Sequence, residues 1–423
     1  MSDFNYWIFR EKHFVKILKL SVLASLLVML MPSGIAAENN GVTDTVIRVG
    51  STLALHSDVS KVANDLKLGI EAALKGEKVQ GRSIQLLVEN DSYIPEKAVE
   101  AAKKLIDQGI FVMLGSNGTA STLSVLPVLE KHKIPAVGFQ WGAEPAPGDV
   151  FTFRPNYAQE TIAAIEAAIA AGIKPEGVCL YAQNDAYGMN GVKGAIEVFS
   201  KHAGMARVVE KLKEVVAMPE PEPQRNNIGP VGVYNRGSLH AGPGYNSLKK
   251  WEAENSTKCQ FIVTASTVLP TVNAITFMNG YKKENWIYSV LTAAGGEVLI
   301  DGLEKQGLKS RLMATQVVPI LEPTYPITIE ARKALGDALT PFAMEGFVAA
   351  KMFLAIMNNI KGEITRENFI KSARSQVFDI GGLKIDFTGG GYKPGSNTVF
   401  LSYLDGNSFK AITAQQLAKE LAK

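Results

Sequence analysis

The segment from residue 110 to residue 145 constrains the fold more than any other part of the chain. It contains a short apolar run at 111–114, the polar loop GSNGTAS, an amphipathic helical pattern, and a second apolar run at 136–139. Short apolar runs bounded by glycine and proline are typical of parallel strands that are covered on both faces. The segment therefore predicts a βαβ unit. Its loops leave the carboxyl ends of neighbouring strands, where open α/β sheets bind ligands.

The same alternation of strand and helix patterns continues along the chain after about residue 45. The predicted strands are residues 46–51, 83–89, 177–182, 211–216, 261–265 and 286–290. Extended segments at 151–157 and 312–319 separate two series of such units, and residues 217–244, rich in proline, glycine and asparagine, read as a long surface loop. The fold class predicted from these patterns is α/β, in two similarly built lobes.

The N-terminus has the order of features found in secretory signal peptides. Four basic residues precede an apolar run at 20–31, and a helix breaker and small residues follow at 32–37. The apolar run is too short to span a bilayer comfortably. We therefore expect a signal peptide over residues 1–36, cleaved near Ala36 or Ala37, and an exported product.

The net charge bears on the binding partners of the protein, and the two cysteines bear on its disulfide content. The formal net charge is +3, and the leader contributes four bases against two acids, or +2, which leaves about +1. Such a balance gives no support to nucleic-acid or membrane-surface binding. Cys179 and Cys259 each lie in or beside a predicted strand of the same half of the chain. In an oxidising compartment they either pair or stay as two buried thiols, and the sequence leaves both open.

Two loops of the first segment form the candidate site. Ser116, Asn117 and Thr119, with backbone N–H groups at a helix start, suit a carboxylate or another polar group. Gln140 and Trp141 in the next loop add an amide in an apolar wall. For single residues a structural role is the alternative: Ser116 or Thr119 caps the helix, and Trp141 fills the core.

Motifs of known catalytic chemistry are absent from the sequence. It contains no CxxC, no GxSxG and no Walker-type phosphate loop, and the five histidines are scattered without metal-ligand spacing. The SxxK at 247–250 lacks its companion motifs and reads as a helix start, and the glycines at 389–391 read as a turn. We therefore expect a binding protein, not an enzyme, with no cofactor and no metal.

Several segments in this order resemble one known family. They are IRVGSTLALHSD, GRSIQLLVENDSYIPEKAVEAAKKLID, FVMLGSNGTASTLSVLPVLEKHKIPAVGF, FRPNYAQE, LYAQNDAYGMNGVKG, TQVVP and AMEGFVAAKMFL. The family is the type I periplasmic solute-binding proteins of ABC transporters, the leucine/isoleucine/valine-binding proteins. The resemblance implies two α/β lobes, each a mainly parallel sheet flanked by helices, with three crossing strands as the hinge. It places lobe 1 at 45–154 and 317–385, and lobe 2 at 155–316 and 386–423.

The resemblance also implies a ligand site between the lobes. The residues that it assigns to this site, from the cleft mouth through lobe 1 to lobe 2, are Leu55, His56, Ser116, Asn117, Thr119, Gln140, Trp141, Tyr157, Asp185, Tyr187, Ser266, Thr267 and Thr292. His56 is the only histidine on a candidate cleft loop, and a solvated loop histidine is the alternative for it.

One departure from the family bears on the ligand. Amino-acid binders of this family often place a carboxylate in lobe 2 against the ligand's α-ammonium, after the strand that corresponds here to WIYSVL, and this chain has Leu291, Thr292, Ala293 and Ala294 at that point. A buried cation without a counter-charge is costly. Unless Asp185 substitutes, this favours a neutral or acidic small molecule with an apolar or aromatic part.

The resemblance implies a periplasmic receptor that captures a small solute by hinge closure. Its partners would be the inner-membrane permease subunits of an ABC importer with their ATPases, and the chain would be a monomer. A sensory protein of the same build that signals to a membrane receptor is the alternative. A secreted hydrolase using Asp185 or Ser116 is a third hypothesis, for which the sequence shows no nucleophile–base pair.

Overall fold

The computed structural model describes residues 40–142, 148–219 and 224–421. The predicted signal peptide and its cleavage point lie outside these residues, as does part of the loop that follows Trp141. Residues Gly41–Lys423 form one compact unit, which contains both of the large sheets.

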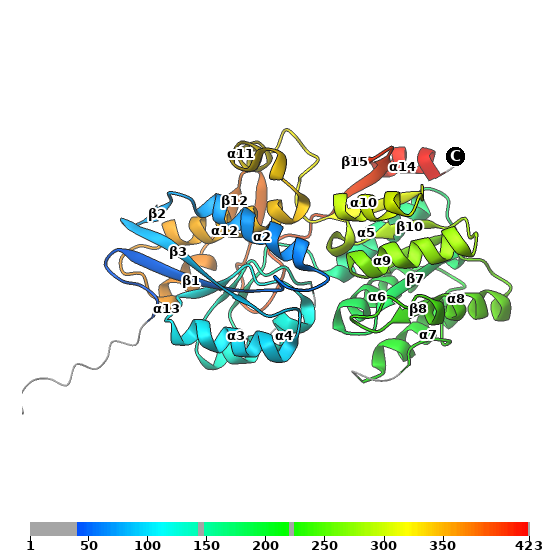
Figure 1. Ribbon diagram of the computed structural model, residues 1–423, viewed down its shortest axis with the longest axis horizontal. Helices are drawn as coiled ribbons and strands as arrows, with labels where there is room; N and C mark the ends of the chain where they lie inside the picture. The colour runs from blue at the N-terminus through cyan, green and yellow to red at the C-terminus, as the bar shows by residue number, and fades with distance from the viewer. Residues whose placement is uncertain (1–39, 143–147, 220–223, 422–423) are drawn as a thin grey trace, which may run out of the picture. The chain divides into compact units, whose positions relative to one another are not determined.

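Two large sheets organise the described residues (Figure 1). Sheet 1 has the order β2-β3-β1-β4-β5-β6, and its neighbours pair in parallel except for the antiparallel pair β2–β3. Its strands are β1 (Val46–Leu53), β2 (Lys78–Val79), β3 (Arg82–Asn90), β4 (Val112–Leu114), β5 (Ala136–Val137) and β6 (Val150–Phe151). We call the part built on this sheet the sheet-1 lobe.

Sheet 2 has the order β15-β14-β11-β10-β9-β7-β8. The strands from β11 to β8 are parallel, and β14 and β15 add an antiparallel edge. They are β7 (Val178–Gln183), β8 (Val231–Tyr234), β9 (Phe261–Ala265), β10 (Ile287–Val290), β11 (Leu312–Gln316), β14 (Phe400–Asp405) and β15 (Ser408–Ala411). The part built on it is the sheet-2 lobe.

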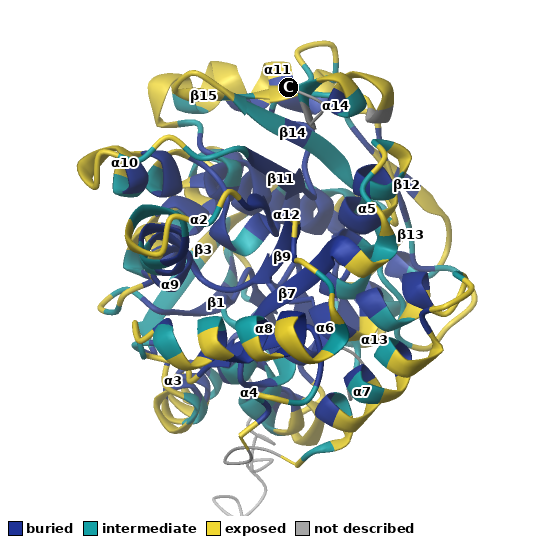
Figure 2. Cartoon of the chain, turned by 90° about the vertical axis from the view of Figure 1, so that its right-hand side faces the viewer, coloured by how far each residue is buried: buried dark blue, intermediate teal, exposed yellow. Residues whose placement is uncertain are grey.

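Helices flank both sheets. Those of the sheet-1 lobe are α2 (Ser60–Leu74), α3 (Pro95–Asp107), α4 (Thr119–Lys131), α11 (Pro326–Leu335), α12 (Pro341–Asn358) and α13 (Arg366–Ala373). Those of the sheet-2 lobe are α5 (Tyr157–Ala170), α6 (Ala186–Phe199), α7 (Ala206–Ala217), α8 (Gly242–Asn255), α9 (Val268–Ile275), α10 (Glu297–Lys305) and α14 (Ala414–Leu421). Figure 2 shows β7 and β9 as buried strands behind helices whose outer faces are exposed, so the apolar surface of the sheet is covered.

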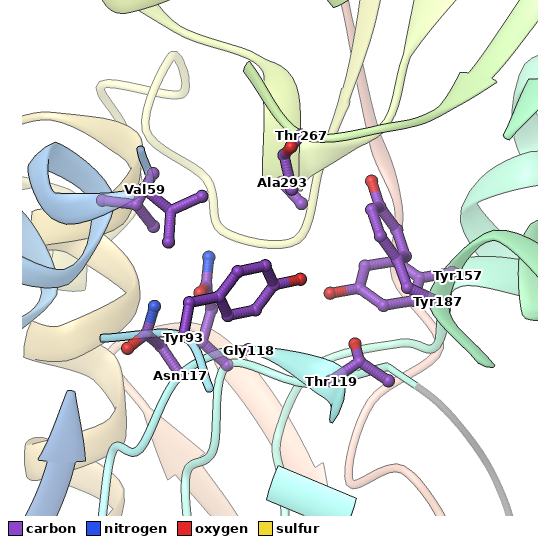
Figure 3. Close-up of a pocket in the computed structure, with 11 residues that line it drawn as sticks. Val59, Tyr93, Asn117, Gly118, Thr119, Tyr157, Tyr187, Thr267 and Ala293 are labelled. Carbon is purple, nitrogen blue, oxygen red and sulfur yellow. The ribbon is translucent and has the colours of Figure 1, made fainter. Parts of the chain in front are cut away.

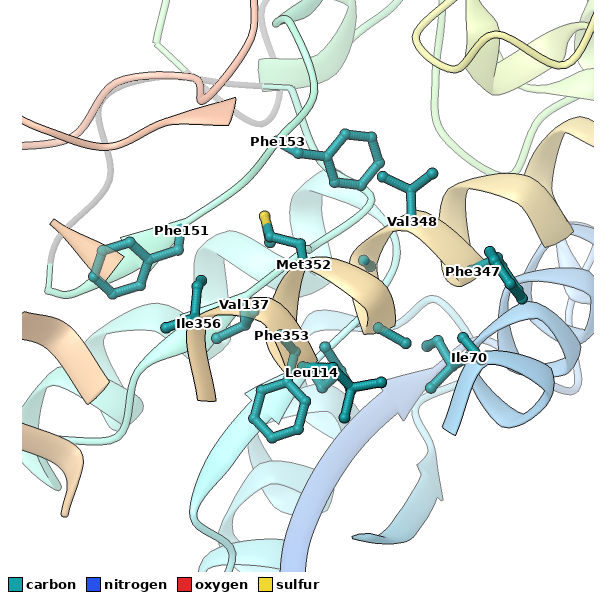
Figure 4. Packing of buried hydrophobic residues seen from close by; sticks show 14 of the residues in the cluster. Ile70, Leu114, Val137, Phe151, Phe153, Phe347, Val348, Met352, Phe353 and Ile356 are labelled. Atoms are coloured by element: carbon teal, nitrogen blue, oxygen red, sulfur yellow. The ribbon is translucent and has the colours of Figure 1, made fainter. Parts of the chain in front are cut away.

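The core of the sheet-1 lobe forms around α12. Its side chains Phe347, Met352 and Phe353 pack with residues of α2, β4 and β5 in one buried cluster (Figure 4). Gly69 of α2 and Gly346 of α12 let the two helices approach closely, since a Cβ on either one would overlap a carbonyl oxygen of the other helix. Glycines at the crossing thus let α2 and α12 pack in direct contact.

In the described part of the chain, the backbone passes between the two lobes three times, at 152–156, 317–325 and 387–399. Before the last passage, β12 (Val377–Ile380) and β13 (Leu383–Asp386) form a hairpin, and their buried side chains join the core of the sheet-1 lobe. These connections match the three crossings that the family resemblance implies, two of which the sequence patterns also predict. The residue boundaries given above for the lobes stay a prediction.

Two predicted elements are wrong. Residues 211–216 belong to helix α7, where Val209, Leu212 and Val215 are buried at helical spacing. The predicted surface loop at 217–244 contains the buried strand β8, and α8 starts inside its end, at Gly242. The strand is only VGVY, with Gly229 and Pro230 before it and Asn235 after it, which is too short to show a period.

The open question about the cysteines is settled by a disulfide between Cys179 and Cys259, which joins the start of β7 to the segment before β9. Within the described residues, no helix is both long and apolar enough to cross a membrane.

Candidate functional site

A small cavity lies between the two lobes (Figure 3). Its volume is about 30 Å³, and both lobes line it. The lining residues are Val59, Val62, Tyr93, Asn117, Gly118, Thr119, Gln140, Tyr157, Tyr187, Thr267 and Ala293. Most of them follow the carboxyl ends of parallel strands of the two sheets. This is the sheet edge at which the sequence predicts a site.

The polar loop after β4 forms the wall of the sheet-1 lobe. The N–H and hydroxyl groups of Thr52 donate to Ser116 Oγ at 3.1 and 3.0 Å, and the Ala54 N–H donates to Asn117 Oδ1 at 3.0 Å. Ser116 therefore holds the loop against β1 and does not line the cavity. Thr119 begins α4, whose N-cap residue Gly118 offers no side-chain cap. The first N–H groups of a helix can bind a polar group of a ligand.

Three tyrosines form the aromatic part of the lining. Figure 3 shows Tyr93 reaching from the sheet-1 lobe towards Tyr157 and Tyr187. The ring centroids of Tyr157 and Tyr187 are 4.3 Å apart, and the Tyr187 hydroxyl donates to the carbonyl oxygen of Ser266 at 3.1 Å. Burial raises the pKa of each of the three phenols. At neutral pH they are uncharged hydroxyl groups.

Hydrogen bonds among neighbouring loops hold the wall of the sheet-2 lobe. The Tyr234 hydroxyl donates to Gln183 Oε1 at 3.0 Å and accepts from the Ser266 hydroxyl and the Thr267 N–H. Asp185 caps α6, accepting from the Tyr187 N–H at 3.0 Å and from Gln183 Nε2 at 2.6 Å. Burial raises the pKa of Asp185. Asp185 and Ser266 therefore position the loops and do not line the cavity.

A buried charge cluster lies behind Tyr157. Arg154 NH2 is 3.0 Å from Glu160 Oε1, and Arg154 NH1 is 3.5 Å from Glu345 Oε2. The guanidinium also lies 5.1 Å from the centroid of the Tyr157 ring. Burial raises the pKa of Glu345 to about 7, and the neighbouring Arg154 opposes this rise. The N–H and hydroxyl groups of Thr292 both donate to Glu160 Oε2 at 2.8 Å. Thr292 thus stabilises the Glu160 carboxylate of this cluster.

The cavity brings together six of the predicted site residues: Asn117, Thr119, Gln140, Tyr157, Tyr187 and Thr267. Their binding of a ligand stays a prediction. The predicted residues outside its lining are Leu55, His56, Ser116, Trp141, Asp185, Ser266 and Thr292. Trp141 is fully buried and stacks on Tyr392 with centroids 5.7 Å apart, which is the core role given as its alternative. His56 is exposed, and Leu55 packs against the core.

Sequence reasoning missed Val59, Val62, Tyr93, Gly118 and Ala293. A signal existed for Tyr93, because it follows β3 at the same sheet edge, after the turn-forming residues NDS. Gly118 has a φ of +91°, and a Cβ there would lie 2.6 Å from Tyr93 Cε2. The valines come from the start of α2 and gave no polar signal.

Comparisons with known proteins agree with this geometry. A family model described as a periplasmic binding protein matches residues 46–224. A possible leucine/isoleucine/valine-binding protein from Rhodopirellula baltica SH 1 has a similar structure, with a TM-score of 0.77 and 22% identity over 90% of this chain and 99% of that one. A comparison with curated proteins found no match.

Two further solved structures carry the same fold at lower identity. A branched-chain amino acid ABC transporter from Thermus thermophilus with bound valine has a TM-score of 0.65 and 16% identity, over 88% of this chain and 96% of that one. A fatty acid ABC transporter substrate-binding protein from Thermomonospora curvata has a TM-score of 0.67 and 14% identity, over 90% and 95%.

The chain has the two-lobed α/β fold of the type I periplasmic binding proteins. The predicted resemblance to the leucine/isoleucine/valine-binding proteins is confirmed at the level of the fold.

Proposed function

We propose that the chain is the solute-binding component of an ABC importer, which captures a small molecule between its lobes and delivers it to permease subunits and their ATPases. The observation that carries this proposal is the cavity lined by both lobes at the carboxyl ends of their strands. The family match supports it, as do two neighbouring structures that are named as binding proteins. Location in the periplasm, a monomeric state and the absence of catalysis belong to the same proposal.

The volume of the cavity supports capture by hinge closure. This cavity of about 30 Å³ is far smaller than the roughly 300–1,000 Å³ of typical ligand pockets, so an organic solute enters only when the lobes separate. Rotation about the three crossings would open the cleft, and closure would remove water from the bound solute. Hydrogen bonds to that solute are stronger once water is excluded.

The solute class follows from the charges of the lining. None of the described residues that line the cavity carries a formal charge, and the nearby carboxylates of Asp185 and Glu160 already accept hydrogen bonds from other groups. A free ammonium would lose its hydration there without a counter-charge. The α4 N-terminus, Asn117 and Thr119 suit a carboxylate or amide, and the tyrosine rings suit an apolar or aromatic body. We therefore propose a small carboxylate or amide solute without a free amine.

Ser116 and Asp185, the residues that the hydrolase hypothesis would use, do not support it, because both hold neighbouring loops and neither one lines the cavity.

Thermal denaturation with a panel of solutes tests the proposal. The panel contains benzoate, phenylacetate, hexanoate, benzamide, L-valine and L-phenylalanine. We expect at least one carboxylate or amide to raise the melting temperature by several degrees at saturation, because a ligand that binds only the folded state stabilises it by mass action. The two amino acids should give the smallest shifts.

Paired variants supply the control. Thr119→Val removes a hydroxyl from the cavity and should reduce the stabilisation by the bound solute, whereas Thr122→Val alters a buried threonine of the same helix that does not line the cavity. If L-valine gave the largest rise in melting temperature, the proposed solute class would be wrong. No shift with any compound would remove the support for solute capture.

A further inference from the structure

A strained turn in the sheet-1 lobe projects Tyr93 towards the sheet-2 lobe. Ser92 and Tyr93 have φ angles of +54° and +61°, in the left-handed region that residues other than glycine rarely adopt. Side chains hold the turn: the Tyr93 N–H donates to Asp91 Oδ1 at 2.8 Å and the Ser92 N–H donates to Asn90 Oδ1 at 3.2 Å. Backbone strain of this kind persists where surrounding contacts enforce it and is common at ligand clamps.

Two residues of the sheet-2 lobe bind Tyr93 across the cleft. Arg236 NH1 donates to the Tyr93 carbonyl oxygen at 3.1 Å, and its guanidinium lies 5.5 Å from the centroid of the Tyr93 ring. Gln183 Nε2 donates to the Tyr93 hydroxyl at 3.3 Å. Tyr93 thus receives a backbone contact, a cation–π contact and a side-chain hydrogen bond from the opposite lobe.

Hydrogen bonds within the sheet-2 lobe hold Gln183 and the loop of Arg236, the two partners of Tyr93, in place. Tyr234 is the last residue of β8, directly before the loop that carries Arg236, and its hydroxyl donates to Gln183 Oε1. On the other side, the buried Arg225 donates to Asn184 Oδ1 at 2.7 Å, and Asn184 Nδ2 donates to Asn235 Oδ1 at 3.1 Å. The loops after β7 and β8 are therefore tied to each other, so Arg236 and Gln183 approach Tyr93 as one surface.

We propose that Tyr93, Gln183 and Arg236 form a latch that holds the two lobes closed and slows release of a bound solute. The inference rests on the proposed function for its meaning, since the latch acts on the same cleft. Arg236 is exposed and does not line the cavity. It sets the balance between the closed and open forms and leaves the choice of solute to the cavity residues.

The distance distribution between spin labels on the two lobes tests the latch. Lys97 of α3 and Lys250 of α8 are exposed positions outside the cleft, and Lys97→Cys with Lys250→Cys places one label on each lobe of the oxidised, full-length mature chain. Without added solute, we expect a closed population. Arg236→Ala should lower the closed-to-open ratio about tenfold, equivalent to about 1.4 kcal/mol.

Two further variants separate the latch from general effects of losing an arginine. Arg236→Lys keeps the charge but not the planar guanidinium, so it should give an intermediate ratio. Arg207→Ala is the matched control, because Arg207 makes a similar contact with the Trp251 ring, 5.9 Å away, wholly inside the sheet-2 lobe. It should leave the distribution unchanged.

The latch is wrong if Arg236→Ala has the same closed-to-open ratio as the unmodified protein, or if the unmodified protein has no closed population. The measurement needs no solute, so its failure is distinct from that of the proposed function. If no solute of the panel raised the melting temperature but Arg236→Ala lowered the closed fraction, solute capture would be wrong and the latch would still be supported.

Discussion

Single side chains divide into those that face the cavity and those that build the loops around it. Asn117 and Thr119 are predictable from the sequence because they follow a strand at the correct sheet edge. Asp185 and Thr292 satisfy the same criterion, yet their oxygens bind a helix N-terminus and a buried glutamate. Carboxylate and hydroxyl groups serve as caps as readily as ligand contacts, so sequence position alone does not separate the two roles.

Asp91 provides a residue-scale prediction about pH. Burial raises its pKa from 3.8 to about 6, and the Tyr93 N–H opposes this rise. The folded state then binds the proton more tightly than the unfolded state, so the contribution of Asp91 to stability falls as the pH rises through this interval and stays low above it. Asp91→Asn keeps an oxygen for the Tyr93 N–H. It should therefore raise the free energy of unfolding at neutral pH by about 1–3 kcal/mol.

Urea denaturation at acidic and neutral pH measures this effect. The gain from Asp91→Asn should be much smaller at pH values near the ordinary pKa of aspartate than at neutral pH. Asp58→Asn, at an exposed position of the same lobe, is the control. An equal effect of Asp91→Asn at both pH values would show that the burial of its charge does not govern the stability of the turn.

At the scale of helices and strands, the βα units around the first loops are predictable because their apolar runs are bounded by glycine and proline. Helix α7 is misread as a strand because KLKEVV, taken alone, partly alternates polar and apolar residues. The burial of Val209, Leu212 and Val215 shows the helical period only over a longer window. Strand β8 is hidden by its flanking proline and glycine residues. Its burial comes from pairing with β7, a segment distant in the sequence, and from packing under α8, the next element of the chain.

The crossing of α2 and α12 gives a prediction at the same scale. A methyl group at Gly346 would overlap the carbonyl oxygen of Leu66, and backbone atoms cannot move aside as a side-chain tip can. Gly346→Ala should therefore lower the free energy of unfolding by about 3 kcal/mol, at the upper end of the usual cost of overpacking. Gly242→Ala, at the first turn of α8 where a Cβ meets only the side chain of His240, should change it little. Equal effects of the two variants in urea denaturation would contradict close packing at this crossing.

At the scale of the whole molecule, the two-lobed fold is predictable because its strand–helix order extends over nearly all of the described residues. The contacts between the lobes are not, because they join loops far apart in the sequence. Tyr93 contacts Gln183 and Arg236 only after both sheets have formed. The candidate site therefore belongs to neither lobe alone, and uncharged hydrogen-bonding groups and aromatic rings from both lobes line it.

The most direct test identifies the small molecule that the protein carries when it is purified gently from the cell. Denaturing the purified protein releases this compound, and mass spectrometry identifies it. We expect one small molecule per chain, with a carboxylate or amide group, an apolar or aromatic part and no primary amine. When added back, it should bind the unmodified protein and the Thr122→Val variant with equal affinity, and the Thr119→Val variant more weakly. A released primary amine, or equal rebinding to all three proteins, would contradict the account.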